Sequence, residues 1–476
     1  MATFSISTPG IYVFYDDHIV WVEEDVSIEE EGTVLDLREG PNATLLIDGT
    51  ILSSGAGLDP AILVDNLSNG TDVVISDSGS IVSTQHGVEF EQNGGTLVNQ
   101  GTIQAQSTAI ITSGTDPTIQ NFGTIVGESG ISAATLYLNN HGDLTAQFTA
   151  VQASAGGGIQ NTGRITSTNG NAFFLLNTNV TVQNLAGGVI SASLVGLAFA
   201  DVPVAELSNE GSISSGGTTI GVIDSDLFMV NTGSLVSTGF NVIEVDGSGM
   251  VEMNNSGTLS AAMGEAVDGR DATEVSIVNT GEIVGDVTLG AGDDMVLTFG
   301  AGVIAGEVDG GSGADVIVGG AAVDVISGGA DSDYIDGGAG DDDISTSEGA
   351  DIVLGGAGND VITVDRGGAK FLLGEDGSDT FVFTDTAASP AGGEITTILD
   401  FERGADIIDF YAIANGLPLQ FVGTSGFTAG GVAEVATAEI GGVLTVVSLD
   451  ADGNGTADLE LIVYGAIDMD RADFGL

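Results

Sequence analysis

The sequence predicts an all-β protein, in which a parallel β-helix with a period of about 22 residues continues into a parallel β-roll and a β-rich C-terminal domain. Two repeats carry this prediction: one of nine residues over 310–363, and a looser one over about 42–285. Glycine supports it, because 75 glycines in 476 residues are about twice the ordinary usage. We divide the chain into an N-terminal cap (1–41), the β-helix (42–285), the β-roll (286–385) and the C-terminal domain (386–476).

The nine-residue repeat runs without insertion through GGSGADVIV, GGAAVDVIS, GGADSDYID, GGAGDDDIS, TSEGADIVL and GGAGNDVIT. Its sixth position is always aspartate: Asp315, Asp324, Asp333, Asp342, Asp351 and Asp360. An apolar residue follows two positions later in every block, at Ile317, Ile326, Ile335, Ile344, Val353 and Ile362. Two recurrences at one step indicate a turn followed by a short strand with one inward side chain.

Glycines at the first, second and fourth positions are expected to free the backbone for positive φ angles: Gly310, Gly311, Gly313, Gly337, Gly338, Gly340, Gly355, Gly356 and Gly358. The aspartates and nearby carbonyl groups then offer the oxygen ligands that Ca²⁺ prefers. If each block is half a turn, Asp324, Asp342 and Asp360 line one edge of the roll and the other three aspartates line the opposite edge. A solvated acidic loop is the alternative, but it requires no apolar residue in register.

These blocks resemble the RTX nonapeptide family, G-G-x-G-x-D-x-U-x, whose repeats wind into a parallel β-roll that binds Ca²⁺ between turns. The resemblance implies that the aspartates and glycines above are calcium ligands, and that Asp379 in Gly374–Asp379 belongs to a final loop. Gly290–Asp294 resembles an earlier loop. Ala322, Asp331 and Thr346-Ser347 depart from the pattern, and block 364–372 keeps Phe371 in phase but has Ala369 in the aspartate position. The turns with Ala322, Asp331 and Thr346-Ser347 are expected to bind calcium weakly or not at all.

The looser repeat has the form Asn-x-Gly-x-Ile/Leu, as in Asn99–Ile103 and Asn279–Ile283. From Asn99 the intervals between successive asparagines are 22, 19, 21, 23, 25, 22, 24 and 24. This spacing predicts stacked coils with a ladder of asparagine amides at one corner. The region resembles the β-helical stalks of bacterial surface adhesins and autotransporter passengers, which makes glycans or a cell surface candidate partners. Period-two alternation before residue 41 predicts a cap with Trp21 in its core.

The segment Ile395–Phe410 resembles the one that follows the repeats in serralysin-type C-terminal domains, through Asp400, Phe401, Gly404, Asp406 and Ile408. Leu449–Leu459 resembles the late hairpin of that domain, and Asp473-Phe474 resembles its tail. The resemblance implies export by type I secretion machinery. Asp450, Asp452, Asn454 and Asp458 also look like the start of an EF-hand loop, but Leu461 stands where the bidentate glutamate is needed, so we favour a hairpin turn over a calcium site.

A net charge of −61 excludes nucleic acid and anionic membranes as natural partners and favours cations. The chain has no cysteine and no apolar run long enough to span a membrane. Its first residues, MATFSISTPGIYVF, lack the features of a signal peptide, so export is expected to be addressed from elsewhere.

An enzyme is the rival interpretation, because parallel β-helices also carry polysaccharide lyases and epimerases. Such chemistry needs clustered Arg or Lys residues, or a metal ion, beside a tuned base, and a Ca²⁺-assisted lyase that uses scattered carboxylates stays open as an alternative. Only Arg164 and Arg270 are cationic within 42–285, and no H-E-x-x-H motif surrounds His18, His86 or His141. His86 beside Glu89 and His141 beside Asp143 are possible acid–base pairs, although surface histidines at loop tips are the favoured interpretation. We therefore expect no catalytic residue and a secreted, extracellular calcium-binding adhesin, surface-layer or matrix component that folds on calcium after export.

Overall fold

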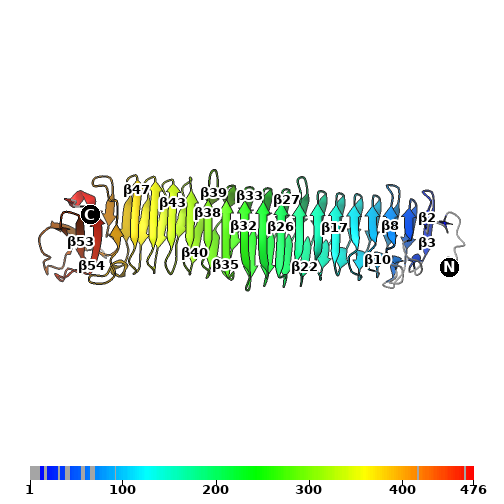
Figure 1. Ribbon diagram of the computed structural model, residues 1–476, viewed down its shortest axis with the longest axis horizontal. Helices are drawn as coiled ribbons and strands as arrows, with labels where there is room; N and C mark the ends of the chain where they lie inside the picture. Colours follow the sequence, from blue (N-terminus) through cyan, green and yellow to red (C-terminus); the bar gives the residue numbers. More distant parts are fainter. Residues whose placement is uncertain are drawn as a thin grey trace. The chain divides into compact units, whose positions relative to one another are not determined.

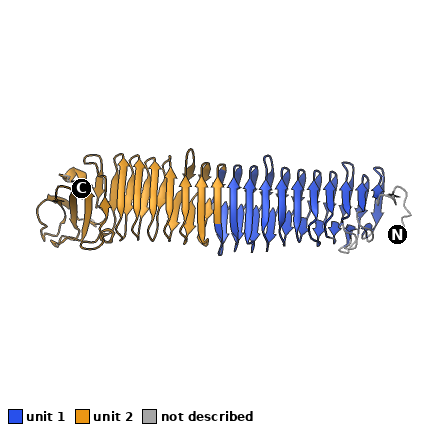
Figure 2. Cartoon of the chain, in the orientation of Figure 1, with its two compact units in different colours: residues 1–250, 258–264 blue, residues 251–257, 265–476 orange. Residues whose placement is uncertain are grey.

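The computed structural model describes residues 11–14, 19–30, 33–37, 43–54, 59–64, 70–91, 93–414, 417–465 and 468–475. His18, residues 1–10 and the terminal Leu476, which entered the sequence predictions, lie outside these residues. The chain divides into two compact units, residues 1–250 with 258–264 and residues 251–257 with 265–476 (Figure 2). The described elements are strands and two short 3-10 helices, which confirms the all-β prediction.

Unit 1 is a parallel β-solenoid with three sheets, and successive coils add one strand to each (Figure 1). Sheet 1 consists of β2 (Ile19–Val22), β5 (Thr44–Ile47), β8 (Asp72–Ile75), β11 (Thr96–Asn99), β14 (Thr118–Asn121), β17 (Leu136–Asn140), β20 (Gly157–Asn161), β23 (Val180–Asn184), β26 (Val204–Asn209) and β29 (Asp226–Asn231). Sheet 2 consists of β3 (Ser27–Glu30), β6 (Thr50–Ser53), β9 (Ser80–Ser83), β12 (Thr102–Ala105), β15 (Thr124–Gly127), β18 (Asp143–Ala146), β21 (Arg164–Ser167), β24 (Val189–Ala192), β27 (Ser212–Ser215), β30 (Ser234–Ser237) and β33 (Thr258–Ala261). Sheet 3 consists of β4 (Leu35–Leu37), β7 (Pro60–Val64), β10 (His86–Phe90), β13 (Thr108–Thr112), β16 (Ser129–Ala133), β19 (Val151–Ala153), β22 (Phe173–Leu176), β25 (Leu197–Ala200), β28 (Ile220–Ile223) and β31 (Ile243–Asp246).

The coils are held together by apolar side chains stacked in register. Ile103, Ile125 and Leu144 are opposite one another in β12, β15 and β18, and each is completely buried. Each short strand contributes a few such residues, and no coil buries its apolar face alone. The core of unit 1 therefore depends on neighbouring coils.

The predicted asparagine ladder is confirmed. The Nδ2 group of Asn121 donates to Oδ1 of Asn140 at 2.7 Å, and equivalent bonds of 2.8 Å link Asn140 to Asn161 and Asn161 to Asn184. The same donors also reach backbone carbonyl groups of the next coil, as Asn140 Nδ2 does at Arg164 O, 3.2 Å away. These asparagines are buried at the end of sheet 1, where their amides satisfy the polar groups of the corner.

The N-terminal region begins with β1 (Ile11–Phe14), which pairs antiparallel with β2. The predicted core position of Trp21 is wrong. In β2 the buried residues are Val20 and Val22, so the alternation of the strand turns Trp21 to the other face. There it is half-buried, and its Nε1–H donates to Oδ2 of Asp48 at 2.5 Å.

Unit 2 begins as a three-sheet solenoid and becomes a two-sheet roll. Sheet 2 has only two described strands here, β36 (Glu282–Val284) and β39 (Val303–Ala305). Sheet 1 comprises β32 (Met250–Asn255), whose residues from Val251 on belong to this unit, β35 (Glu274–Asn279), β38 (Met295–Thr298), β41 (Val316–Gly320), β43 (Tyr334–Ala339), β45 (Ile352–Ala357), β47 (Phe371–Asp376) and β49 (Thr397–Ile398). Sheet 3 comprises β34 (Val267–Asp268), β37 (Val287–Gly290), β40 (Glu307–Gly311), β42 (Val325–Ser327), β44 (Asp343–Thr346), β46 (Val361–Val364), β48 (Thr380–Phe383) and β50 (Ile407–Asp409).

A small, mainly antiparallel sheet follows the roll. Its strands are β51 (Leu419–Gly423), β52 (Ala433–Ile440), β53 (Leu444–Asp450) and β54 (Leu459–Tyr464), and β54 also pairs with β49 of the roll. The hairpin predicted over Leu449–Leu459 joins β53 to β54. Two 3-10 helices, η1 (Thr386–Ala388) and η2 (Arg471–Asp473), flank this region. Phe474 then packs against Phe410 and Phe421, with ring centroids 6.3 and 5.4 Å away.

Within the described residues, no helix has the length and apolar character needed to cross a membrane.

Candidate calcium site in the nine-residue repeats

The aspartates of the repeats form two ladders, one along each sheet of the roll. In each ladder the backbone N–H of one aspartate donates to Oδ1 of the aspartate one turn further on, at 2.8–3.0 Å. The prediction that alternate blocks lie on opposite edges is confirmed. The first ladder contains Asp294, Asp315, Asp333 and Asp351, and the second contains Asp324, Asp342, Asp360, Asp379 and Asp406.

The second carboxylate oxygen of most ladder aspartates is buried and has no hydrogen-bond donor. Among the described residues this holds for Oδ2 of Asp294, Asp315, Asp324, Asp333, Asp342, Asp360 and Asp379. A buried anionic oxygen without a partner is costly, and such oxygens are the ligands that Ca²⁺ prefers. The residues present therefore fit bound calcium, with these carboxylates as the charged ligands.

The first-position glycines keep this space open. A Cβ atom on Gly337 would lie 2.5 Å from Asp342 Oδ2 and 2.6 Å from the carbonyl oxygen of Gly355 in the next turn. Gly310 stands in the same relation to Asp315 Oδ2, and Gly355 to Asp360 Oδ2, at 2.6 and 2.5 Å. Any larger residue would fill the place where the carboxylate and the carbonyl oxygen converge.

The prediction that these first glycines take positive φ angles is therefore wrong, because Gly310, Gly337 and Gly355 are outside the left-handed region. The prediction is correct for the other positions: Gly311, Gly313, Gly338, Gly340, Gly356 and Gly358 have φ angles between 88° and 153°. At Gly338 a Cβ would also lie 2.1 Å from the carbonyl oxygen of Gly320, one turn earlier. Asp331, which replaces a fourth-position glycine, adopts φ 78°.

Burial raises the pKa of the ladder aspartates. For Asp324 it raises the pKa to about 7, and the charge of Asp342 adds to the effect. Burial also raises the pKa of Asp333 to about 7, opposed by the N–H of Asp315 and reinforced by nearby carboxylates. The pKa values of Asp315, Asp342 and Asp379 rise to about 6 for the same first reason. The ladders therefore hold protons more tightly than free aspartates when no cation is bound.

The turn over 364–372 differs from its predicted register. β47 pairs Phe371 with Ile352 and Leu372 with Val353, a step of 19 residues instead of 18. Leu372 is consequently the buried residue, Phe371 is 46% exposed, and Lys370, not Ala369, takes the ladder position of aspartate. One additional residue between Val364 and Phe371 explains the shift, and block counting without the structure could not locate it.

Asp406 and Asp400 complete the end of the roll, a role that the sequence analysis did not assign to them. Asp406 Oδ1 accepts from the N–H of Asp379, and its Oδ2 accepts from Glu402 N at 2.7 Å. The Asp400 carboxylate accepts from Gly374 N and Glu375 N, at 3.0 and 2.9 Å. A signal was present, because Asp406 and Ile408 repeat the aspartate–apolar pair 27 residues, or three blocks, after Asp379.

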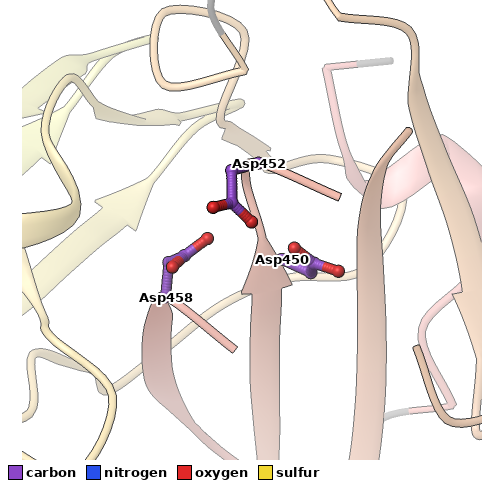
Figure 3. Close-up of side chains that lie close together, drawn as sticks. All are labelled: Asp450, Asp452 and Asp458. Carbon is purple, nitrogen blue, oxygen red and sulfur yellow. The ribbon is translucent and has the colours of Figure 1, made fainter. Parts of the chain in front are cut away.

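A second acidic cluster lies at the β53–β54 hairpin, where Asp450, Asp452 and Asp458 each place a carboxylate oxygen within 4.8 Å of the others (Figure 3). The Asp450 carboxylate accepts from the N–H groups of Gly453, Asn454 and Gly455, at 2.7–3.1 Å. Its oxygens are therefore used by the turn itself, which supports the hairpin interpretation.

The two histidines considered for catalysis have different surroundings. His86 is not at a loop tip: it begins β10, is half-buried, and accepts from Thr108 N at 3.4 Å, while burial lowers its pKa. His141 follows β17, stacks on Phe122 with a centroid distance of 4.8 Å, and bonds to Thr162 Oγ1 at 2.6 Å. Both have structural contacts that account for them.

A family model agrees with the repeats described above. The family model of the RTX calcium-binding nonapeptide repeat (4 copies) matches residues 309–344 and 336–368. No curated protein is significantly similar to the chain. Among solved structures, the solution structure of the AlgE6R2 subunit from the Azotobacter vinelandii mannuronan C5-epimerase shares 22% identity, and the match covers 34% of this chain and 91% of that one with a TM-score of 0.18.

Proposed function

We propose that this chain, whose residues 309–368 carry RTX calcium-binding nonapeptide repeats, is a secreted protein that acts as an adhesin, surface-layer or matrix component. One observation carries the proposal: buried Oδ2 atoms without a partner recur along both ladders, at Asp315, Asp333 and Asp342 among others. The roll cannot neutralise these carboxylates from its own side chains, since residues 286–385 hold 21 acidic residues against Arg366 and Lys370. External calcium supplies the missing charge.

Calcium then links folding to export. The bound ions stabilise only the folded roll, by about 2.7 kcal/mol for each site at a hundredfold excess of calcium over its Kd. Where calcium is scarce, repulsion among the ladder carboxylates opposes the compact state. A chain that is unfolded inside the cell can pass through a type I secretion channel and fold in the calcium outside.

A non-enzymatic role is supported by the cations of the described solenoid coils, which are paired with acids. Arg164 Nε lies 3.8 Å from Asp143 Oδ1. Arg270 Nη2 lies 2.7 Å from Asp268 Oδ2 and 3.0 Å from Glu265 Oε1. Neither guanidinium lies in a cluster of basic side chains that could neutralise a uronate carboxylate, so lyase or epimerase chemistry at these coils would need a metal ion for that task.

The test begins with the culture supernatant of the native producer. We expect the chain there with its C-terminus intact by mass spectrometry, and no release of unsaturated product or epimerised residues from alginate or pectate. Retention of the protein in the cytoplasm would refute export, and turnover of either polymer would favour the lyase or epimerase alternative.

Unit 1 offers a surface suited to carbohydrate. A shallow depression of about 460 Å³ over β14, β17, β20 and β23 is lined by Thr118, Tyr137, Asn139, Gly158, Gln160 and Gln183 among others. Tyr137 is 46% exposed, and a Cβ on Gly158 would lie 3.6 Å from its ring, so the glycine leaves that side of the ring open. An aromatic face flanked by amides can stack on a sugar ring and hydrogen-bond its hydroxyl groups.

We expect the Tyr137→Ala variant to lose binding to the glycans that the wild-type chain binds on a glycan array. Phe148→Ala is the matched control, because Phe148 is also an exposed aromatic residue of unit 1 at 46% but does not line the depression. Equal loss in both variants, or no loss in Tyr137→Ala, would contradict a specific carbohydrate site at Tyr137.

A further inference from the structure

The first aspartate ladder ends at a cation supplied by the chain itself. Lys370 occupies the aspartate position of the turn after Asp351, and its side chain is completely buried. Its ammonium Nζ lies 3.2 Å from Asp351 Oδ2, 3.0 Å from the carbonyl oxygen of Gly349 and 3.3 Å from that of Gly367. A carboxylate and two backbone carbonyl groups from two stacked turns thus surround one positive charge.

This set of ligands is of the kind that Ca²⁺ takes in such loops: carboxylate and backbone carbonyl oxygens. Lysine is rarely buried unless it is paired, and here the pairing is complete, because the ammonium has one acceptor for each of its three N–H donors. The chain contains seven Lys and Arg residues, and Lys370 is the single lysine among them.

The Asp351 carboxylate, which pairs with Lys370, also differs from the other carboxylates of the ladders. Seven other ladder aspartates, Asp294 to Asp379, have an Oδ2 without a donor, whereas Asp351 Oδ2 has both Lys370 Nζ and the hydroxyl of Thr346. Thr346 stands at the first position of its block, where most of the other blocks have glycine. Its hydroxyl group donates to Asp351 Oδ2, whereas the equivalent Oδ2 has no donor in blocks that begin with glycine, such as those of Asp315 and Asp342.

We propose that the Lys370 ammonium replaces a calcium ion at the Asp351 loop, so that this turn is closed by an internal ion pair and binds no metal. The proposal rests on calcium binding by the remaining loops and changes one sequence-based expectation, in which Asp351 was a calcium ligand. It gives the roll one turn whose closure does not depend on external calcium.

The direct test restores the repeat with the double substitution Thr346→Gly and Lys370→Asp. Native mass spectrometry of the calcium-saturated full chain should count one more ion than the wild type. Thr346→Gly with Arg366→Asp is the control, because it changes the charge equally at a neighbouring residue whose ion pair with Glu348 is exposed, and it should leave the count unchanged. A folded double variant with the wild-type count would overturn the proposal, whereas a wild type that binds no calcium would overturn the proposed function itself.

A second measurement needs no substitution and decides the matter if the double variant does not fold. Because Lys370 is the one lysine, labelling with [¹⁵N]lysine gives a single side-chain signal in NMR spectra. We expect an ammonium signal protected from solvent exchange that persists when calcium saturates the other loops. If calcium instead released Lys370 to solvent, the signal would be lost to exchange, and the ion would be shown to take the site.

Discussion

At the residue scale, an aspartate in this roll has two oxygens with separate tasks. Oδ1 of Asp342 accepts from Asp324 N at 2.8 Å and so ties one turn to the next, while Oδ2 is left for a cation. The first-position Gly337 leaves the space beside that second oxygen. One aspartate side chain in each such repeat thus combines a structural hydrogen bond with an oxygen ligand for a cation.

Replacing both Asp342 and Asp360 by alanine removes two stacked ligands from the second ladder. We expect the variant to bind at least one calcium ion fewer by calorimetry, and to need a several-fold higher calcium concentration for folding. Asp343→Ala with Asp376→Ala removes the same charge from exposed positions and is the control. Unchanged stoichiometry and midpoint in the ladder variant would mean that these aspartates are not ligands.

At the element scale, the sequence was informative wherever the period was regular. The step of nine placed Asp315 and Asp333 in register, and the Asn-x-Gly signature placed Asn121 and Asn140 on one ladder. It was insufficient where one residue changes the phase. A single strand cannot show which of two alternating faces is inward, as at Trp21, nor where one extra residue enters, as before Lys370.

The site could be predicted less completely than the fold. Aspartate and glycine types followed from the repeat, but the neutralisation of Asp351 by Lys370 and Thr346 requires contacts between turns. The ladder position of Asp406 likewise depends on strand pairing of β50 with β48, because this turn spans 27 residues instead of the usual 18. Such contacts depend on three-dimensional stacking, which spacing alone does not determine.

The asparagine ladder makes a prediction at this scale. Asn161→Ala leaves the buried Oδ1 of Asn184 without its 2.8 Å donor, and a buried unsatisfied group costs about 1–3 kcal/mol. We expect a loss of that size in the free energy of unfolding of unit 1, measured by urea titration followed by circular dichroism. Gln160→Ala breaks a similar 2.8 Å amide bond to Gln183 that is exposed, and it should cost much less. Equal costs would show that burial of the ladder is unimportant.

At the scale of the whole molecule, the chain has a net charge of −61, and the ladders concentrate buried carboxylates in unit 2. The coils of unit 1 are held together by apolar stacking, and we expect the roll to require cations in addition. The two units should therefore respond differently to the removal of calcium. The pH dependence of their stability should show whether protons or calcium ions neutralise the ladder carboxylates.

Protons and calcium compete for the same oxygens, and this sets the sign of the pH dependence. The folded-state pKa values of Asp324 and Asp333 are about 7, above the ordinary value of 3.8, so without calcium the folded roll binds more protons than the unfolded chain between those values. Stability in EDTA should therefore fall as the pH rises from about 4 to about 7. Calcium needs the deprotonated carboxylates, so the stabilisation that a given calcium concentration adds to the folded roll should shrink as the pH falls below about 7.

Both slopes can be measured on the full chain by hydrogen exchange of peptides from 307–385, with peptides from 96–237 in unit 1 as the internal control. In EDTA, we expect the roll peptides to be more protected at pH 5 than at pH 8, while the unit 1 peptides stay protected at both. In a calcium titration, the additional protection that a given calcium concentration confers on the roll peptides should be smaller at pH 5.5 than at pH 8. Greater protection of the calcium-free roll at pH 8 than at pH 5 would contradict the raised pKa values, because burial of these carboxylates would then favour their charged form.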